Sequence, residues 1–187
     1  MLCGVELSGA IEEKEQKNML HGTIPGKFAK HSPLRTTLNF NELEGPIPQS
    51  LVSCTMLQVL DIGSKVDDTF PYWLESLLEL QVLVLHSNQF YGSVWSCSKM
   101  KHYFPKLKVF DLSNDRFCGP LPAWYFKDLN AMKDVSEADR KLQYMGESYY
   151  QDSITVTMER LQLELVKIIT TFIAIDFSNN NFHGEIA

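Results

Sequence analysis

The side chains in this chain that could do chemistry are its histidines and cysteines, and neither group has the spacing that catalysis or metal binding needs. The histidines are His21, His31, His86, His102 and His183, and the cysteines are Cys3, Cys54, Cys97 and Cys118. No histidine stands at a metal-ligand or catalytic-triad spacing from a cysteine, serine or carboxylate. The cysteines form no Cys-x-x-Cys pair, so we expect small apolar residues or free thiols rather than zinc ligands. Since there is also no glycine-rich phosphate loop, the sequence predicts no cofactor and no enzyme.

Composition and charge predict a protein with a substantial core and no affinity for nucleic acid. Of the 187 residues 44% are hydrophobic, and 17 Lys and Arg against 23 Asp and Glu give a formal net charge of -6. The charges form no basic block, so nucleic acid is not an expected partner. The longest apolar run near the C-terminus, 168–175, is far shorter than the about 20 residues of a membrane helix. The first 18 residues lack the basic start and apolar stretch of a signal peptide.

One spacing of apolar residues recurs along the chain and is its strongest signal. Counted from Leu80, apolar residues fall at +3, +5, +10 and +14, with Asn88 at +8 and Gly92 at +12. The same offsets recur from Leu107 and from Phe172. A fixed period of this kind indicates stacked units, none of which can bury its apolar face alone.

The offsets are those of the leucine-rich repeat, LxxLxLxxNxLxGxIP. Less regular units start at Leu34 and Leu57, the tail of an earlier unit covers 18–25, and the starts from 34 to 107 are separated by 23, 23 and 27 residues. The xLxLx part predicts a short strand whose alternate residues point inward. The sequence therefore predicts an α/β repeat fold, a right-handed leucine-rich-repeat solenoid with a curved parallel β-sheet on its concave face.

A polar residue at the end of each predicted strand is expected to lie inside the array. Each coil turns there, and the turn leaves backbone groups that need hydrogen-bond partners when they are buried. An amide carries both donors and acceptors, so Asn88 and Asn180 can bridge adjacent coils, and Asp115 holds the matching position between them. The glycine four residues later permits the tight return of the coil.

An insert interrupts the array between the fourth and fifth predicted strands. Leu107 and Phe172 are 65 residues apart, and one repeat of about 24 leaves an insert of about 41 residues. The predicted organisation is a non-repeat segment at 1–17, repeats at 18–125, the insert at 126–168 and an incomplete final repeat at 169–187.

The insert has its own secondary-structure pattern. Residues 127–145 are polar with good helix formers, and Ser136 to Asp139 resembles a capping pair, which predicts a helix. Residues 152–168 alternate, which predicts a β-hairpin that turns near Arg160. Three aromatic residues precede it, Tyr144, Tyr149 and Tyr150. Two interpretations stay open: the insert projects and carries binding, or its tyrosines pack on the neighbouring coils.

The residues expected on the concave face are those that flank the inward positions of each strand. Asp61, Asp111 and Asp176 fall in one column, which Val84 interrupts, and His86 lies in the next column. One interpretation is an acidic stripe that contacts a basic peptide or protein, because concave faces are the usual binding surfaces of solenoids. The other is that these carboxylates accept hydrogen bonds from neighbouring strand or turn amides, since Asp followed by Ser or Gly recurs in the repeat.

The sequence, including residues outside the repeat consensus, resembles the extracellular arrays of plant leucine-rich-repeat receptor-like proteins of the disease-resistance type. The resemblance covers residues 18–187. It is carried by the Gly-x-Ile-Pro tails at 22–25 and 45–48, by the segments 50–64, 65–93, 104–114 and 119–133, and by 149–168 followed by 171–186. The insert looks like that family's island, and the whole segment looks like the C-terminal part of a long ectodomain.

The resemblance implies a recognition module without a kinase. It implies a location on the extracellular face of the plasma membrane, a protein or peptide ligand and a co-receptor kinase as a further partner, although this chain holds no membrane segment. The expected ligand-binding residues are Asp61, Val84, His86, Asp111, Asp176, Tyr144, Tyr149 and Tyr150. The implied role is in immune perception or developmental signalling.

Two alternative functions stay open. The first is a secreted inhibitor of a pathogen cell-wall-degrading enzyme, although such inhibitors are short uninterrupted arrays and this chain has an insert. The second is a truncated gene product without independent function, because the chain stops at Ala187 where the repeat pattern asks for proline.

Overall fold

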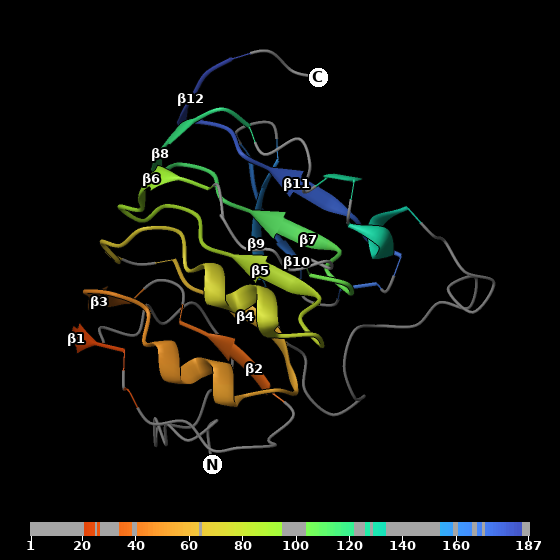
Figure 1. Cartoon of the computed structure of the whole chain (residues 1–187), viewed down its shortest axis with the longest axis horizontal. Coiled ribbons are helices and arrows are strands. Elements are labelled where there is room, and N and C mark those ends of the chain that lie inside the picture. The colour runs from red at the N-terminus through yellow and green to blue at the C-terminus, as the bar shows by residue number, and fades with distance from the viewer. Residues whose placement is uncertain are drawn as a thin grey trace.

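The computed structural model describes most of the repeats and part of the insert. The residues described are 21–24, 26, 34–38, 41–63, 65–94, 104–121, 126–127, 129–133, 154–158, 161–165, 168–169 and 171–184. Within them the chain forms the stacked coils of a leucine-rich-repeat solenoid (Figure 1).

The main sheet consists of one strand from each coil, as the repeat pattern predicts. Its strands are β2 (Leu34–Thr37), β4 (Leu57–Asp61), β5 (Val82–Val84), β7 (Val109–Asp111) and β11 (Ala174–Asp176). They pair in parallel in the order β11-β7-β5-β4-β2. Leu60, Leu83, Phe110 and Ile175 lie in register across four strands, so the repeat offsets become one row of inward residues, of which the first three are buried in the core.

A second set of short parallel strands follows the asparagine position of each coil, and the sequence did not predict it. These strands are β1 (His21–Thr23), β3 (Glu42–Glu44), β6 (Tyr91–Ser93), β8 (Arg116–Gly119) and β12 (Asn181–Phe182). They form a two-stranded sheet, β1-β3, and a three-stranded sheet, β12-β8-β6. Single β-bridges of Glu44 with Lys65 and of Thr69 with Tyr91 continue the parallel pairing from β3 to β6. Three 3-10 helices complete the coils, η1 (Gln49–Ser53), η2 (Tyr72–Ser76) and η3 (Asn130–Met132).

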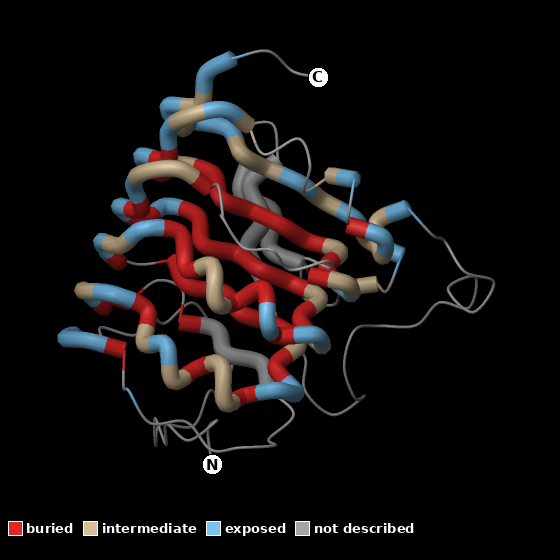
Figure 2. Tube along the Cα trace, in the orientation of Figure 1, coloured by how far each residue is buried: buried red, intermediate tan, exposed pale blue. Residues whose placement is uncertain are grey.

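The core fills the space between the strands and the 3-10 helices, where the tube in Figure 2 is buried. The inward leucines of the strands are fully buried, and phenylalanines stack along the array behind them. The Phe117 ring stacks on Phe90 at 5.7 Å and on Phe182 at 6.4 Å between centroids. Each coil therefore buries its apolar face against the next, which supplies most of the driving force for folding.

The inward amides lie where the sequence predicts them. Asn88 is 8% exposed, accepts the N–H of Val66 at 3.1 Å, and donates to the carbonyls of Ile62 at 2.6 Å and Leu85 at 2.7 Å. Asn180 repeats this arrangement two coils further along, accepting from Phe117 N at 3.0 Å. The prediction that these amides bridge adjacent coils is confirmed.

The repeat glycines adopt the backbone conformation that the return of the coil demands. Gly45 and Gly92 have φ of 78°, and Gly119 has φ of 89°, a region that L-residues with a side chain rarely occupy. At Gly119 an added Cβ would also lie 3.4 Å from the Ser93 hydroxyl oxygen of the preceding coil. The positive φ explains why the pattern requires glycine there, since a contact at 3.4 Å is an ordinary one.

The insert contains the predicted hairpin. Strands β9 (Ile154–Met158) and β10 (Leu161–Leu165) are antiparallel, and Met158 pairs with Leu161. Within the predicted helix at 127–145, the described residues show α-helical backbone at Lys127 and the 3-10 turn η3, and residues 134–145, including the capping pair, lie outside the described residues. The boundaries of the four predicted segments remain predictions.

The cysteines correct one expectation. Cys54 is disulfide-bonded, to a cysteine outside the described residues, whereas Cys118 is a free, exposed thiol. The expectation of apolar filler or free thiols was wrong for Cys54, because distance along the sequence does not measure separation in a solenoid. Residues a full repeat apart lie on stacked coils only about 5 Å from each other.

Candidate functional site

The main sheet brings the sequence-predicted binding residues together on the face opposite the leucine core. Val59, Val82, Val109 and Ala174 lie in register across β4, β5, β7 and β11, and Asp61, Val84, Asp111 and Asp176 form the neighbouring column. His86 follows β5 on the same side as Val84, because alternate residues of an extended chain share a face. We call these nine residues the inner face.

Most of the inner face is buried in this structure, which the sequence did not predict. The four residues Asp61, Val84, His86 and Asp111 are each at most 2% exposed, and Asp176 is half-buried. A bare concave surface would leave such side chains in solvent. The inner face is therefore covered by other parts of the chain.

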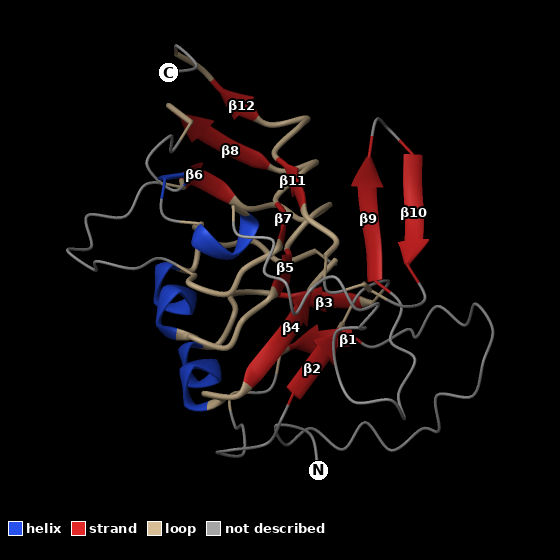
Figure 3. Ribbon diagram, turned by 90° about the vertical axis from the view of Figure 1, so that its right-hand side faces the viewer, coloured by secondary structure: helices blue, strands red, loops and turns tan. Residues whose placement is uncertain are grey.

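One of the covering residues belongs to the end of the insert. Ile168 is 4% exposed and packs in a cluster with Val59, Val82, Val84 and Val109, separate from the main core. Figure 3 shows the hairpin β9–β10 on one side of the main sheet and the 3-10 helices on the other. The hairpin of the insert thus lies on the concave side, and Ile168 lies over the apolar column of the inner face.

The aspartates of the inner face make hydrogen bonds to the turns that follow them. Asp111 Oδ1 accepts from the Ser113 N–H at 2.9 Å and from the Ser113 hydroxyl at 2.7 Å. Asp176 Oδ1 accepts from the Ser178 N–H at 2.8 Å. These bonds support the interpretation of Asp-x-Ser as a turn device, and a contact of the same carboxylates with a basic ligand remains a prediction.

His86 is a polar group of the inner face that is satisfied at only one of its two ring nitrogens among the described residues. Its Nδ1 lies 3.0 Å from the Ser87 hydroxyl, while its Nε2 is buried without a hydrogen-bond partner among the described residues. Burial lowers the pKa of His86, and the nearby carboxylates of Asp111 and Asp176 act in the opposite direction. The imidazole is therefore neutral at pH 7, with one nitrogen left for a further donor or acceptor.

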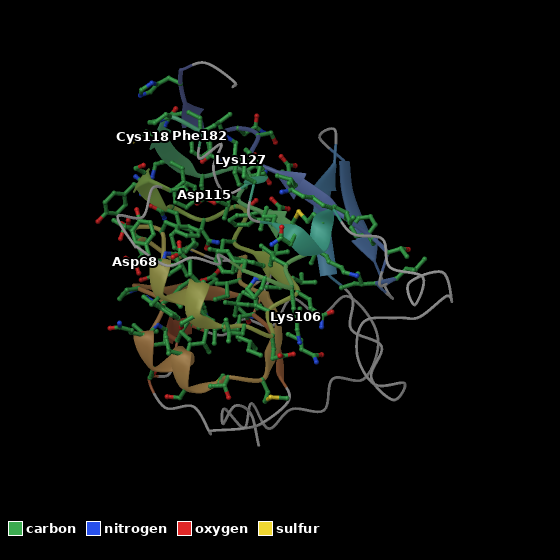
Figure 4. All side chains as sticks on the ribbon, turned by 45° about the vertical axis from the view of Figure 1, so that its right-hand side comes forward. Asp68, Lys106, Asp115, Cys118, Lys127 and Phe182 are labelled. Carbon is green, nitrogen blue, oxygen red and sulfur yellow. The ribbon has the colours of Figure 1, made fainter. Side chains whose placement is uncertain are left out.

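A second unsatisfied polar atom lies deeper in the array, at Asp115. Its Oδ1 accepts the Phe90 N–H at 2.8 Å, as an asparagine would, but its Oδ2 is buried and has no partner within the described part of the chain. Burial raises the pKa of Asp115 to about 8, against the hydrogen bonds from the Phe90 and Asn88 backbone. Figure 4 shows Asp115 below Cys118 and Phe182 in the stack of coils.

Sequence reasoning missed Ile168 and placed three residues that the structure does not describe. Ile168 begins the apolar run 168–175, and that run directly after an alternating segment was the available signal. Tyr144, Tyr149 and Tyr150 lie outside the described residues. Among the residues that are described, no group of three His, Cys, Asp or Glu could hold a metal ion, and no helix is both long and apolar enough to cross a membrane.

Solved structures with the same architecture define the class of protein. The leucine-rich-repeat ectodomain of the Arabidopsis thaliana membrane receptor kinase GASSHO1/SCHENGEN3, solved in complex with CASPARIAN STRIP INTEGRITY FACTOR 2, has a TM-score of 0.53 and 29% identity, over 62% of this chain and 14% of that one. A TDR receptor has a TM-score of 0.55 at 23% identity, over 61% of this chain and 19% of that one. This similarity supports the assignment of the fold only. This chain is a leucine-rich-repeat protein of the kind found in plant receptor ectodomains.

In sequence, the chain is similar to plant receptor-like proteins. Receptor-like protein 18 of Arabidopsis thaliana is 41% identical over 91% of this chain, and Receptor-like protein 43 is 41% identical over 90%. The chain spans 20% and 24% of the lengths of these two relatives. No family model matches the chain. The chain is a homologue of plant receptor-like proteins and corresponds to about a fifth of their length.

Proposed function

We propose that this chain is a non-catalytic recognition module of a plant receptor-like protein, which binds a protein or peptide ligand at the extracellular face of the plasma membrane. The observation that carries the proposal is the inner face, where an apolar column lies directly beside a column with three carboxylates. Homology to receptor-like proteins at about 40% identity supports the same function.

The chemistry of the inner face indicates the kind of ligand. Parallel strands repeat every coil, so a ligand that follows the array meets the same two columns several times. The valine column favours apolar side chains, and Asp61, Asp111 and Asp176 favour a basic group. An extended peptide with alternating apolar and basic residues fits both. The GASSHO1/SCHENGEN3 ectodomain, which shares the fold, was itself solved with a bound factor.

A peptide-display experiment tests the proposal on the full chain. Selection of a random 12-residue peptide library should enrich peptides that combine apolar and basic residues. The double variant Asp61→Asn, Asp176→Asn should lower the enrichment of basic peptides at least tenfold, because it removes two carboxylates of the inner face. The matched control is Asp67→Asn, Asp68→Asn, which changes two carboxylates on the turn before Thr69 and should leave the selection unchanged. Absence of enrichment, or equal effects of both pairs, would refute the proposal.

The role in immune perception or in development, and the engagement of a co-receptor kinase, belong to the same proposal. A secreted inhibitor of a wall-degrading enzyme would use the same face of the array. Inhibition of a polygalacturonase by the purified chain separates this alternative from a receptor module. Activity in that assay, together with no peptide selection, would favour the inhibitor.

A further inference from the structure

The inner face carries a feature that a ligand-binding surface does not need, which is a cover made by the same chain. Val59, Val82, Val84 and Val109 are each at most 1% exposed, although they point away from the leucine core. We propose that Ile168 is an internal occupant of the inner face, and that a ligand has to displace it to reach Val84. This inference rests on the proposed function and adds a closed state to it.

The cover is separate from the core that holds the coils together. The residues of the main cluster point to the other side of the same strands, as Leu60, Leu83 and Phe110 do, and they pack against the other coils. Ile168 instead joins a small cluster that otherwise contains only inner-face residues and Phe172. Loss of the Ile168 contact therefore leaves the stacking of the leucines unchanged.

The attachment of the final strand does not depend on the cover either. Ala174 N donates to Lys108 O at 3.0 Å, and β11 pairs with β7 from Ala174 onward. Ile173, directly before that strand, is exposed. Ile168 can thus leave the inner face while β11 stays in the sheet.

Ile168 is complementary to the apolar residues of the inner face, but it offers no hydrogen bond to the polar residues. Ile168 packs on valines, but His86 Nε2 stays buried without a partner among the residues described. A buried polar group without a hydrogen bond opposes the closed state. A peptide that offers apolar side chains to the valines and a hydrogen-bonding group to His86 satisfies both, so it can compete with the internal segment. This defines the partner as an extended peptide with apolar and polar side chains in alternation.

Cysteine accessibility in the full chain tests the closed state without any ligand. In a Cys118→Ser background, Val84→Cys reports on the inner face, and Leu83→Cys reports on the core one residue earlier in the same strand. Modification by N-ethylmaleimide is followed over time by mass spectrometry of the peptide that contains residues 83 and 84. We expect Ile168→Asp to accelerate modification at position 84 at least tenfold and to leave position 83 protected. Ile168→Ala should give a smaller rise at position 84 only.

The matched control is Ile173→Asp, which places the same charge on an exposed isoleucine five residues away and should change neither rate. Equal acceleration at positions 83 and 84 in the Ile168 variants would show that the segment is part of the core and would overturn the proposal. Fast modification at position 84 in the parent, or no change with Ile168→Asp, would overturn it as well. These outcomes are independent of the peptide selection, so failure of the cover and failure of the proposed function are distinguishable.

Discussion

At the scale of single residues, Asp115 departs from the rule that the other coils follow. Asn88 and Asn180 use one amide to accept from the neighbouring coil and to donate to buried carbonyls. A carboxylate can reproduce only the accepting half, which it does at Phe90 N. A proton on the other oxygen restores a donor, and the raised pKa of about 8 means that Asp115 holds this proton at neutral pH.

Asp115→Asn should therefore stabilise the chain and remove part of its pH dependence. An unfolded aspartate loses its proton near pH 4, whereas folded Asp115 keeps it to about pH 8, so the folded state binds more protons between these values. Stability then falls as the pH rises from about 4 to 8. We expect the asparagine variant to abolish this slope and to gain about 1–3 kcal/mol at pH 9. Urea unfolding at pH 5, 7 and 9 measures both effects.

The control for this prediction is Asp68→Asn, on a half-buried turn residue whose Oδ1 accepts from Thr69 N at 2.7 Å. It should leave the slope of stability with pH as in the parent. An Asp115→Asn variant with the parent's slope would contradict the assignment of a bound proton to this carboxyl group.

At the scale of elements, the asparagine bridges should matter more to stability than any exposed polar residue. Asn88→Leu leaves the Val66 N–H and the Ile62 carbonyl buried without their present partner, in a site that leucine can fill by volume. We expect a loss of at least about 2 kcal/mol in the free energy of unfolding, from chemical denaturation. Gln89→Ala, on the exposed neighbour, should change it by less than about 0.5 kcal/mol. Equal effects of the two substitutions would argue against the bridge.

The sequence predicted the elements that short offsets determine. Asn88, Gly92 and the leucines before them determine the local backbone structure, because the strand, the turn and the return of the chain all fall within one coil. The hairpin β9–β10 was predictable for the same reason, since alternation over five residues on each side is a local pattern.

Features that depend on contacts between distant segments were not predictable. The bond at Cys54 and the packing of Ile168 on Val82 each join parts of the chain whose spacing carries no signal. The strands β6 and β8 were not predictable either, because they form only through pairing between coils. Tyr91-Gly92-Ser93 has no strand pattern of its own. The burial of His86 could not be read from the repeat.

At the scale of the whole molecule, each coil of the solenoid is stabilised by its contacts with the neighbouring coils. The rings of Phe90, Phe117 and Phe182 stack in sequence, and the amide bridges join the same coils. Burial is complete at Leu83 and Phe110 and falls away at β11, where Ile175 is 44% exposed. In a linear array of this kind, the coil with the least buried core is the first to open.

The disulfide at Cys54 should stabilise the whole array rather than one turn. Cys54 is fully buried between η1 and β4, so its loss affects coils on both sides. Reduction with dithiothreitol, or Cys54→Ser, should lower the free energy of unfolding by about 2–4 kcal/mol. Cys118→Ser, on the exposed free thiol, is the control and should leave thermal unfolding unchanged. Identical melting curves with and without reductant would contradict this expectation.

That bond also ties the maturation of the chain to redox chemistry. Thiols are kept reduced in the cytosol and are oxidised along the secretory route, so the same polypeptide would acquire its cross-link in one compartment and lack it in the other. Recombinant material from an oxidising host and from a reducing host should accordingly differ in yield and in resistance to proteases. The choice of expression host is thus itself an experiment on this fold.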